Sequence, residues 1–277
     1  MIIQLKSISK ILFIFSLTLS IFSCEKIIDI PLNESAQKIV IEASASNLLG
    51  DSYVFLSRTA TLYGQDIFEK VNNGTVKITD KDGVQTIFTE DGTGVGKYTH
   101  PTFIVTPNNE YVLQVTIDDQ DYSASSTTQS LTEIAYIYSV KVPNEGFAPG
   151  GGPTGQNDSI NLLFMAYSDN VNEKNYYRFN IYTNGERNKR VNITDDKVTN
   201  GQNIEAPFFD SYKSKDTVVV EMVNMDKANY TYFYSLANSS SGGPFSATPA
   251  NPVSNIDNGA LGYFGAYLKD TLSIIIP

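Results

Sequence analysis

Residues 75–90 read Thr-Val-Lys-Ile-Thr-Asp-Lys-Asp-Gly-Val-Gln-Thr-Ile-Phe-Thr-Glu, and this stretch decides the fold class. Apolar and polar residues alternate over 75–80, a period of two that is typical of a half-buried strand. Asp82-Gly83 then leads into a second run over 84–90. An Asp-Gly pair between two such runs is a strong signal for a two-stranded hairpin. We therefore expect an antiparallel β-hairpin here.

Short runs with the same character lie on both sides of the hairpin, separated by turn residues at intervals of about 8–12 residues. They fall at 39–41, 53–59, 110–118 and 122–128. Many short strands with regular turns are typical of an all-β sandwich. The sequence thus predicts an immunoglobulin-like or transthyretin-like β-sandwich over residues 37–129.

The pattern changes near residue 130, where the predicted strands become longer. They fall at 134–142, 159–167, 176–182 and 217–223, and at 261–268 and 271–276 at the end of the chain. We expect residues 130–277 to form a second β-rich domain, closed as a sandwich or as a partial barrel. The sequence does not choose between these two forms of closure.

One short helix is expected near 226–238 within this second region. Asp226 is a residue type that caps helix N-termini. Aromatic and small residues follow it at helical spacing, namely Tyr230, Phe233, Tyr234 and Ala237. This spacing places them on one face of the helix, and the simplest interpretation is that this face packs on the core.

Composition excludes several classes of protein. The 277 residues include one Cys, one His and no Trp, with a formal net charge of −10. One Cys cannot form an internal disulfide, and one Cys with one His cannot build a Cys/His zinc cage. A binder of the nucleic-acid backbone needs the opposite net charge, so we expect no nucleic-acid partner.

The N-terminus reads as a secretion signal over residues 1–23. Lys6 and Lys10 precede an apolar run over 11–22 that contains no charged residue. That run has the length of a signal-peptide core and is too short for a comfortable membrane-spanning helix.

The secretion signal ends at Ile21-Phe22-Ser23-Cys24, which resembles a bacterial lipobox. A small residue precedes the predicted cut, and the thiol after it can carry a diacylglycerol thioether. We expect Cys24 to be lipidated and residues 24–36 to be a tether. Several acyl chains would make the attachment to the membrane effectively permanent.

Candidate site residues are few. Phe208, Phe209 and Tyr212 follow Pro207 in a loop-like setting, where they could contact a ligand or pack into the core. The lone His100 lacks a recognisable nucleophile or orienting partner, so we expect no catalytic residue. We expect no cofactor and no metal. A loose calcium site among acidic turn residues stays open as an alternative, at Asp80, Asp82, Glu90 and Asp91.

Several segments together carry a family resemblance, at 24–31, 53–58, 74–80, 242–246, 251–256 and 262–267. On these residues the chain resembles the Bacteroidetes outer-membrane lipoproteins grouped as domain of unknown function 4249. The resemblance implies a lipid-anchored protein of the outer membrane, often encoded beside a TonB-dependent receptor. It supplies no catalytic residue to carry over.

Three functions follow from these observations. The first is a non-enzymatic accessory or ligand-capture subunit associated with a TonB-dependent uptake system, whose partners would be a receptor barrel, the lipid anchor and a small nutrient. The second is a surface module for glycan binding or adhesion. The third is a hydrolase that uses paired carboxylates, for which no particular pair stands out among the acidic residues.

Overall fold

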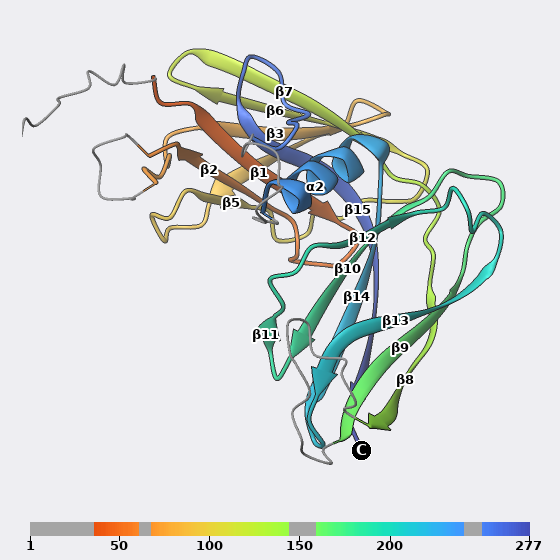
Figure 1. The fold of residues 1–277 in the computed structure, drawn as a ribbon. Helices are drawn as coiled ribbons and strands as arrows, with labels where there is room; N and C mark the ends of the chain where they lie inside the picture. The colour runs from red at the N-terminus through yellow and green to blue at the C-terminus, as the bar shows by residue number, and fades with distance from the viewer. Residues whose placement is uncertain (1–35, 61–67, 144–158, 241–250) are drawn as a thin grey trace, which may run out of the picture. The chain divides into compact units, whose positions relative to one another are not determined.

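The computed structural model describes residues 36–60, 68–143, 159–240 and 251–277 (Figure 1). These residues confirm the mainly β fold class with one helix. The elements are β1 (Ile39–Ser46), β2 (Tyr53–Arg58), β3 (Thr75–Asp80), β4 (Gln85–Glu90), β5 (Lys97–Thr99), β6 (Glu110–Ile117), β7 (Gln120–Thr127), β8 (Ile134–Pro143), β9 (Ser159–Ser168), β10 (Tyr176–Thr183), β11 (Glu186–Arg187), β12 (Asn192–Asp195), β13 (Asn203–Tyr212), β14 (Thr217–Met225), α2 (Lys227–Ser240) and β15 (Leu261–Ile275).

The hairpin predicted from the opening stretch is confirmed. β3 and β4 pair antiparallel, and Gly83 in the turn has a φ of 83°, in the left-handed region that glycine enters without steric cost. The hairpin belongs to a long sheet with the order β11-β10-β14-β15-β1-β2-β5-β4-β3-β6-β7. A separate sheet has the order β13-β9-β8.

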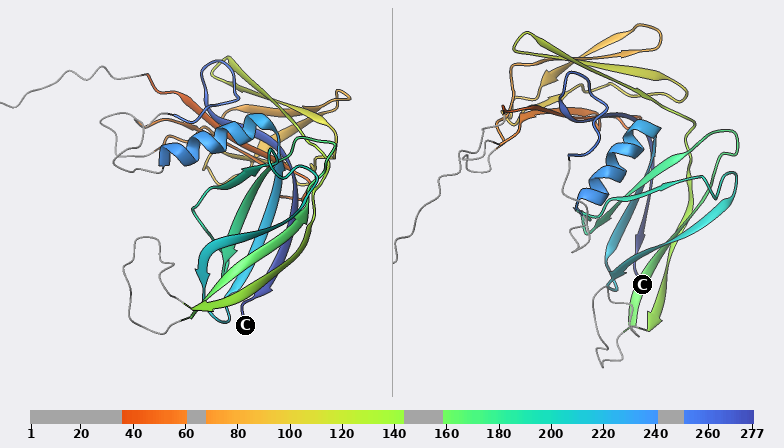
Figure 2. Two further views of the ribbon diagram at one scale, coloured as in Figure 1. Left: turned by 45° about the vertical axis from the view of Figure 1, so that its right-hand side comes forward. Right: turned by 45° about the horizontal axis from the view of Figure 1, so that its top comes forward.

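The first hydrophobic core lies where the long sheet folds over on itself, with β3, β6 and β7 above β1 and β2 (Figure 2). Alternate residues of both groups of strands point inward, as the period of two requires. Its members include Ile41, Leu56, Ile78, Leu113 and Phe264. This is the β-sandwich architecture that the sequence predicted for the N-terminal part.

The second core lies between β10, β14 and the end of β15 on one side and the β13-β9-β8 sheet on the other. Its members include Met165, Tyr177, Phe208, Val220 and Met222. The long sheet therefore serves both cores, and two layers of strands enclose each of them.

β15 joins the two cores. Its first part pairs parallel with β1, from Leu261 to Tyr267, and its remainder pairs antiparallel with β14 up to Ile275. The two strands expected near the C-terminus are one continuous strand, which packs into the first core before it reaches the second. Contacts accordingly group residues 36–277 into one compact unit. The division into two domains, 37–129 and 130–277, stays a prediction.

The helix predicted near 226–238 is confirmed as α2. Asp226 caps it, because its carboxylate accepts the backbone N–H of Asn229 at 2.8 Å. α2 covers the face of β10, β14 and β15 that points away from the second core (Figure 2). Tyr232 and Phe233 form the buried face, whereas Tyr234, expected on that face, is 53% exposed.

None of the helices in the described ranges has the length and apolar character needed to cross a membrane.

Candidate functional site

Two of the three aromatic residues proposed as ligand contacts lie in the second core. Phe208 is 7% exposed and meets Phe179 edge-on, with 5.8 Å between the ring centroids. Tyr212 is 5% exposed, and burial raises its pKa. Both side chains pack in the second core in this structure. Their contact with a ligand stays a prediction. The side chain of Phe209 and all of Cys24 lie outside the described residues.

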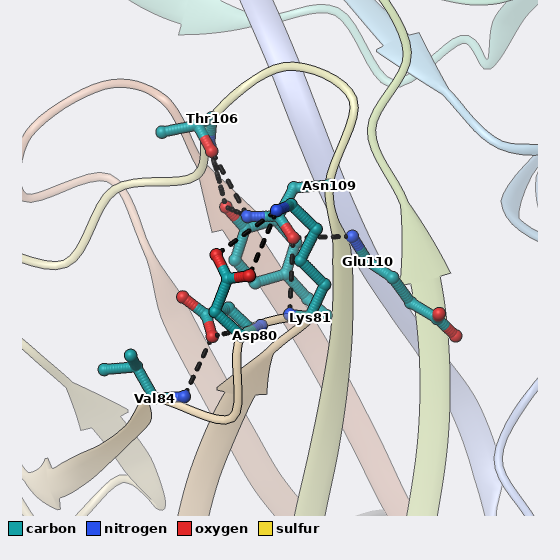
Figure 3. A network of polar contacts seen from close by, with 8 residues as sticks. Asp80, Lys81, Val84, Thr106, Asn109 and Glu110 are labelled. Atoms are coloured by element: carbon teal, nitrogen blue, oxygen red, sulfur yellow. Dashed lines mark hydrogen bonds and ion pairs between the residues drawn. The ribbon is translucent and has the colours of Figure 1, made fainter.

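Carboxylates in the turns after β3 and β4 are occupied by backbone amides. Asp80 accepts the N–H of Val84 at 2.9 Å (Figure 3). Glu90 accepts the N–H groups of Gly92 and Gly94 at 2.8 and 3.0 Å. Across 36–60, 68–143, 159–240 and 251–277, no group of three His, Cys, Asp or Glu side chains could hold a metal ion. These acidic residues build turns.

His100 is placed as a turn residue. Its Nδ1 accepts the backbone N–H of Thr102 at 3.4 Å, and its ring lies 6.0 Å from that of Phe88. These contacts place the imidazole beside a ring of the first core.

A cavity of about 400 Å³ lies beside α2, and residues of β1, β2, β10 and β15 also line it. We call it the Arg178 pocket. Its aromatic lining consists of Tyr53, Tyr232, Phe233 and Tyr263. Its basic lining consists of Arg178, Arg187, Lys189 and Arg190. The volume lies within the range of small-molecule sites, which combine apolar walls with a few placed polar groups.

The alternation of β10 explains why an arginine reaches this cavity. Tyr177, Phe179 and Ile181 point into the second core, so Arg178 points to the opposite face, under α2. The residue is only 7% exposed. Its guanidinium carbon lies 4.0 Å from the ring centroid of Phe233 and 5.5 Å from that of Tyr267, at cation–π distance.

The guanidinium of Arg178 lacks a compensating anion within the described ranges. Its buried Nε has no hydrogen-bond partner, and no carboxylate of a described residue forms an ion pair with it. A buried charge is normally paired, because its loss of hydration is costly.

Lys269 provides the comparison within the same chain. It is also 7% exposed, but its ammonium lies 2.7 Å from Asp51 and 3.5 Å from Glu221. Lys269 therefore has the two carboxylates that Arg178 lacks. The contrast singles out Arg178 as the buried cation whose charge the neighbouring described residues leave unbalanced.

The charge of the pocket opposes that of the whole chain, which is −10. Among the described residues of the lining, Glu42 is the single acidic one. Arg187 donates to the amide oxygen of Asn180 at 2.7 Å, and Arg190 lies 3.6 Å from Asp210 outside the lining. The pocket keeps a net positive charge after these pairings are counted.

The tyrosines of the lining do not cancel this charge. Burial, with a smaller effect of Glu42, raises the pKa of Tyr232 to about 12. Burial also raises the pKa of Tyr263 well above its usual value. Because both phenols stay protonated near neutral pH, they offer uncharged rings and hydroxyl groups to whatever enters.

A second hollow of about 490 Å³ lies on the other flank of α2. Tyr176 and Tyr230 line it, with 5.0 Å between their ring centroids, and Tyr230 stacks on the exposed Tyr234 at 6.0 Å. Its charges are mixed: the ammonium of Lys197 pairs with Asp195 at 2.9 Å. This hollow presents flat rings beside polar groups of both signs.

Sequence reasoning did not find Arg178. The usable signal was a charged residue inside the apolar strand 176–182, on the face opposite Tyr177 and Phe179. That signal is local. The four-residue basic lining was beyond its reach, because residues 187–190 follow a turn and the aromatic walls come from distant parts of the chain.

Over the part of the chain that the structure describes, these features define a mainly β protein of two sheets and one helix, with a basic, aromatic-walled pocket beside the helix. A model of the family described as domain of unknown function (DUF4249) matches residues 25–273, so the chain belongs to that family. No curated protein matches the chain.

Proposed function

We propose that this protein is a non-enzymatic, lipid-anchored subunit that captures a ligand for a TonB-dependent uptake system. The observation that carries the proposal is the Arg178 pocket. A cavity with aromatic walls and one buried, unbalanced cation is built for binding. The lipobox at Ile21–Cys24 and the receptor context implied by the family resemblance supply the anchor and the partner.

The lipid anchor is tested by labelling the bacterium with radioactive palmitate. We expect label on the wild-type chain and none on Cys24→Ser, because the thiol is the only site that can carry the thioether. Immunoblotting confirms that both chains are made. Label retained by Cys24→Ser, or absent from the wild type, would reject the anchor.

The partner is tested by affinity purification from native membranes in mild detergent. We expect a TonB-dependent receptor barrel to co-purify in amounts comparable to the bait. An unrelated tagged lipoprotein of the same membrane is the control. Repeated purifications without any receptor would remove the uptake part of the proposal.

A second candidate function is glycan binding, favoured by the series Tyr176, Tyr230 and Tyr234. Tyr234 is exposed and the other two are partly buried, and such rings beside polar side chains can stack on the apolar faces of sugar rings. On a glycan array we expect Tyr230→Ala and Tyr234→Ala to lose binding. Tyr136→Ala is the matched control, since Tyr136 is 50% exposed and lies on β8. A wild-type chain that binds no glycan eliminates this candidate.

A further inference from the structure

We propose that the ligand of the Arg178 pocket is a small organic anion, with one carboxylate or phosphate group on a flat apolar body. The inference deepens the proposed capture function and rests on it. The anionic group pairs with the guanidinium of Arg178, and the flat body lies against the tyrosines of the lining.

The unbalanced charge of Arg178 carries the first step. Residue 178 is buried by α2 and β15, and its Nε–H has no acceptor among the described residues. Burying a cation without a partner costs free energy that an arriving anion can recover. An anion therefore gains more from this pocket than a neutral molecule of the same shape does.

The geometry of the guanidinium carries the second step. Phe233 lies against the guanidinium, 4.0 Å from its central carbon. Contact with a ring leaves the N–H groups pointing outward from the edge of the planar fork. Nε–H lies buried without an acceptor among the described residues, so an anion reaches it only when neighbouring side chains move aside. Carboxylates and phosphates accept two parallel hydrogen bonds from such an edge, which makes them the matching acceptors.

The third step concerns the basic residues at the mouth of the pocket. Arg187, Lys189 and Arg190 follow one another closely after β10 and line the same cavity as Arg178. All three residues are exposed. A cluster of one sign in a concave surface raises the local concentration of the opposite charge, so these residues are suited to attract the anion.

The fourth step concerns the aromatic residues that line the pocket. Tyr232 of α2 and Tyr263 of β15 lie 4.9 Å apart by ring centroid, and Tyr53 of β2 completes the aromatic side. Both Tyr232 and Tyr263 have raised pKa values because of burial, so they stay neutral and do not repel an anion. Their rings offer a flat apolar surface that suits an aromatic or planar body.

The test is calorimetric titration of the full chain in mild detergent at low ionic strength. The probes are benzoate and phenyl phosphate, with benzamide and benzylamine as neutral and cationic analogues of similar shape. We expect at least one anion to bind with a Kd below about 1 mM. We expect benzamide and benzylamine to bind at least tenfold more weakly than that anion. The tighter anion identifies the group, carboxylate or phosphate.

Variants locate the site. We expect Arg178→Lys to weaken anion binding at least tenfold and Arg178→Met to abolish it, whereas Arg187→Met at the mouth weakens it a few-fold. Arg58→Lys is the matched control, because Arg58 already pairs with Asp118 in another part of the chain. Circular dichroism checks that each variant is folded.

Three results would overturn the inference: no saturable binding of either anion to the wild type, equal binding of benzamide, or unchanged binding by folded Arg178→Lys. The first two need no variant, so a misfolded mutant cannot obscure them. If the protein binds an anion but no receptor co-purifies with it, only the uptake function is rejected. A receptor partner without anion binding would reject only this inference.

Discussion

At the scale of single residues, Arg178 and Lys269 are equally buried cations with different partners. Both are 7% exposed, yet Lys269 contacts two carboxylates and Arg178 contacts aromatic rings. A paired buried cation holds its neighbours in place, because removing it leaves their charges uncompensated. An unpaired one contributes little net stability and is available to a ligand.

This contrast predicts effects of different size on the free energy of unfolding. Arg178→Met should stay within about 1 kcal/mol of the wild type in the absence of ligand, since the lost cation–π contact is offset by relief from burying the charge. Lys269→Met should lower stability by about 3–5 kcal/mol, because Asp51 and Glu221 lose their shared cation. Urea unfolding followed by circular dichroism measures both. The reverse order would contradict the assignment.

Single residues also mark the limits of prediction from sequence. The burial of Phe208 and Tyr212 depends on β9 and β10, which pack on β13 from elsewhere in the chain. Local sequence could not distinguish packing from ligand contact for them. For Arg178 the periodicity of β10 was visible, but the missing counter-charge depends on the whole fold.

At the scale of elements, α2 is fixed by polar contacts at its N-terminus. The Asp226 carboxylate caps the helix and also accepts the hydroxyl of Ser126 at 2.7 Å and the N–H of Thr127 at 3.1 Å. One side chain therefore joins α2 to β7. Since α2 forms a wall of the Arg178 pocket, this junction also shapes the pocket.

We expect Asp226→Ala to lower the free energy of unfolding by about 2 kcal/mol, the loss of the cap plus two charge-assisted hydrogen bonds. Lys227→Ala is the control, because Lys227 lies in the same turn and is exposed. Urea unfolding curves of the two variants provide the measurement. An equal, small effect of both would show that the cap does not hold the helix.

The pairing of β1 with β15 depends on Gly262. Its φ is 99°, and a Cβ there would lie 2.0 Å from the carbonyl oxygen of Ile41. Gly83 also has a positive φ of 83°, but a Cβ there meets nothing within 4 Å. Comparing the two glycines therefore separates steric collision from backbone strain.

Gly83→Ala should cost about 1–2 kcal/mol, the strain of a left-handed residue. Gly262→Ala should cost more than about 3 kcal/mol, because β1 and β15 must also separate. Thermal and urea unfolding check the pair. Similar costs for both would contradict the close approach of β1 and β15.

Most elements were predictable because their signals are local: the Asp-Gly turn, the period of two, and the capped run of 226–238. β15 was split into two expected strands because Lys269 and Asp270 interrupt the apolar pattern. Partners from distant elements accommodate that interruption, since Lys269 pairs with Asp51 and Asp270 accepts the N–H of Ile134 at 2.7 Å. Such compensation is invisible in a local window.

At the scale of the whole molecule, buried tyrosines make the fold sensitive to alkali. Burial raises the pKa of several tyrosines above the usual 10, namely Tyr167, Tyr177, Tyr212, Tyr232, Tyr263 and Tyr267. In the unfolded chain they lose their protons near the usual value. The stability they contribute is therefore complete below pH 10 and is lost as the pH rises above it.

We expect the free energy of unfolding to fall by about 1.4 kcal/mol per pH unit for each such tyrosine above pH 10. For Tyr232 the loss continues to about pH 12. Tyr232→Phe should reduce the slope, and Tyr234→Phe, at an exposed position, should leave it unchanged. Urea unfolding at stepped pH gives the slope. Ionisation of all tyrosines at pH 10 in the folded protein would contradict it.

The central claim is that an anion compensates the buried charge of Arg178. The most direct measurement is the ¹⁵N–¹H signal of the Arg178 Nε group during titration with benzoate or phenyl phosphate, assigned by its disappearance in Arg178→Lys. We predict a saturable downfield shift of its proton, with the calorimetric Kd, because a carboxylate or phosphate oxygen accepts the unused hydrogen bond. A signal that stays unchanged while the anion binds would contradict the claim.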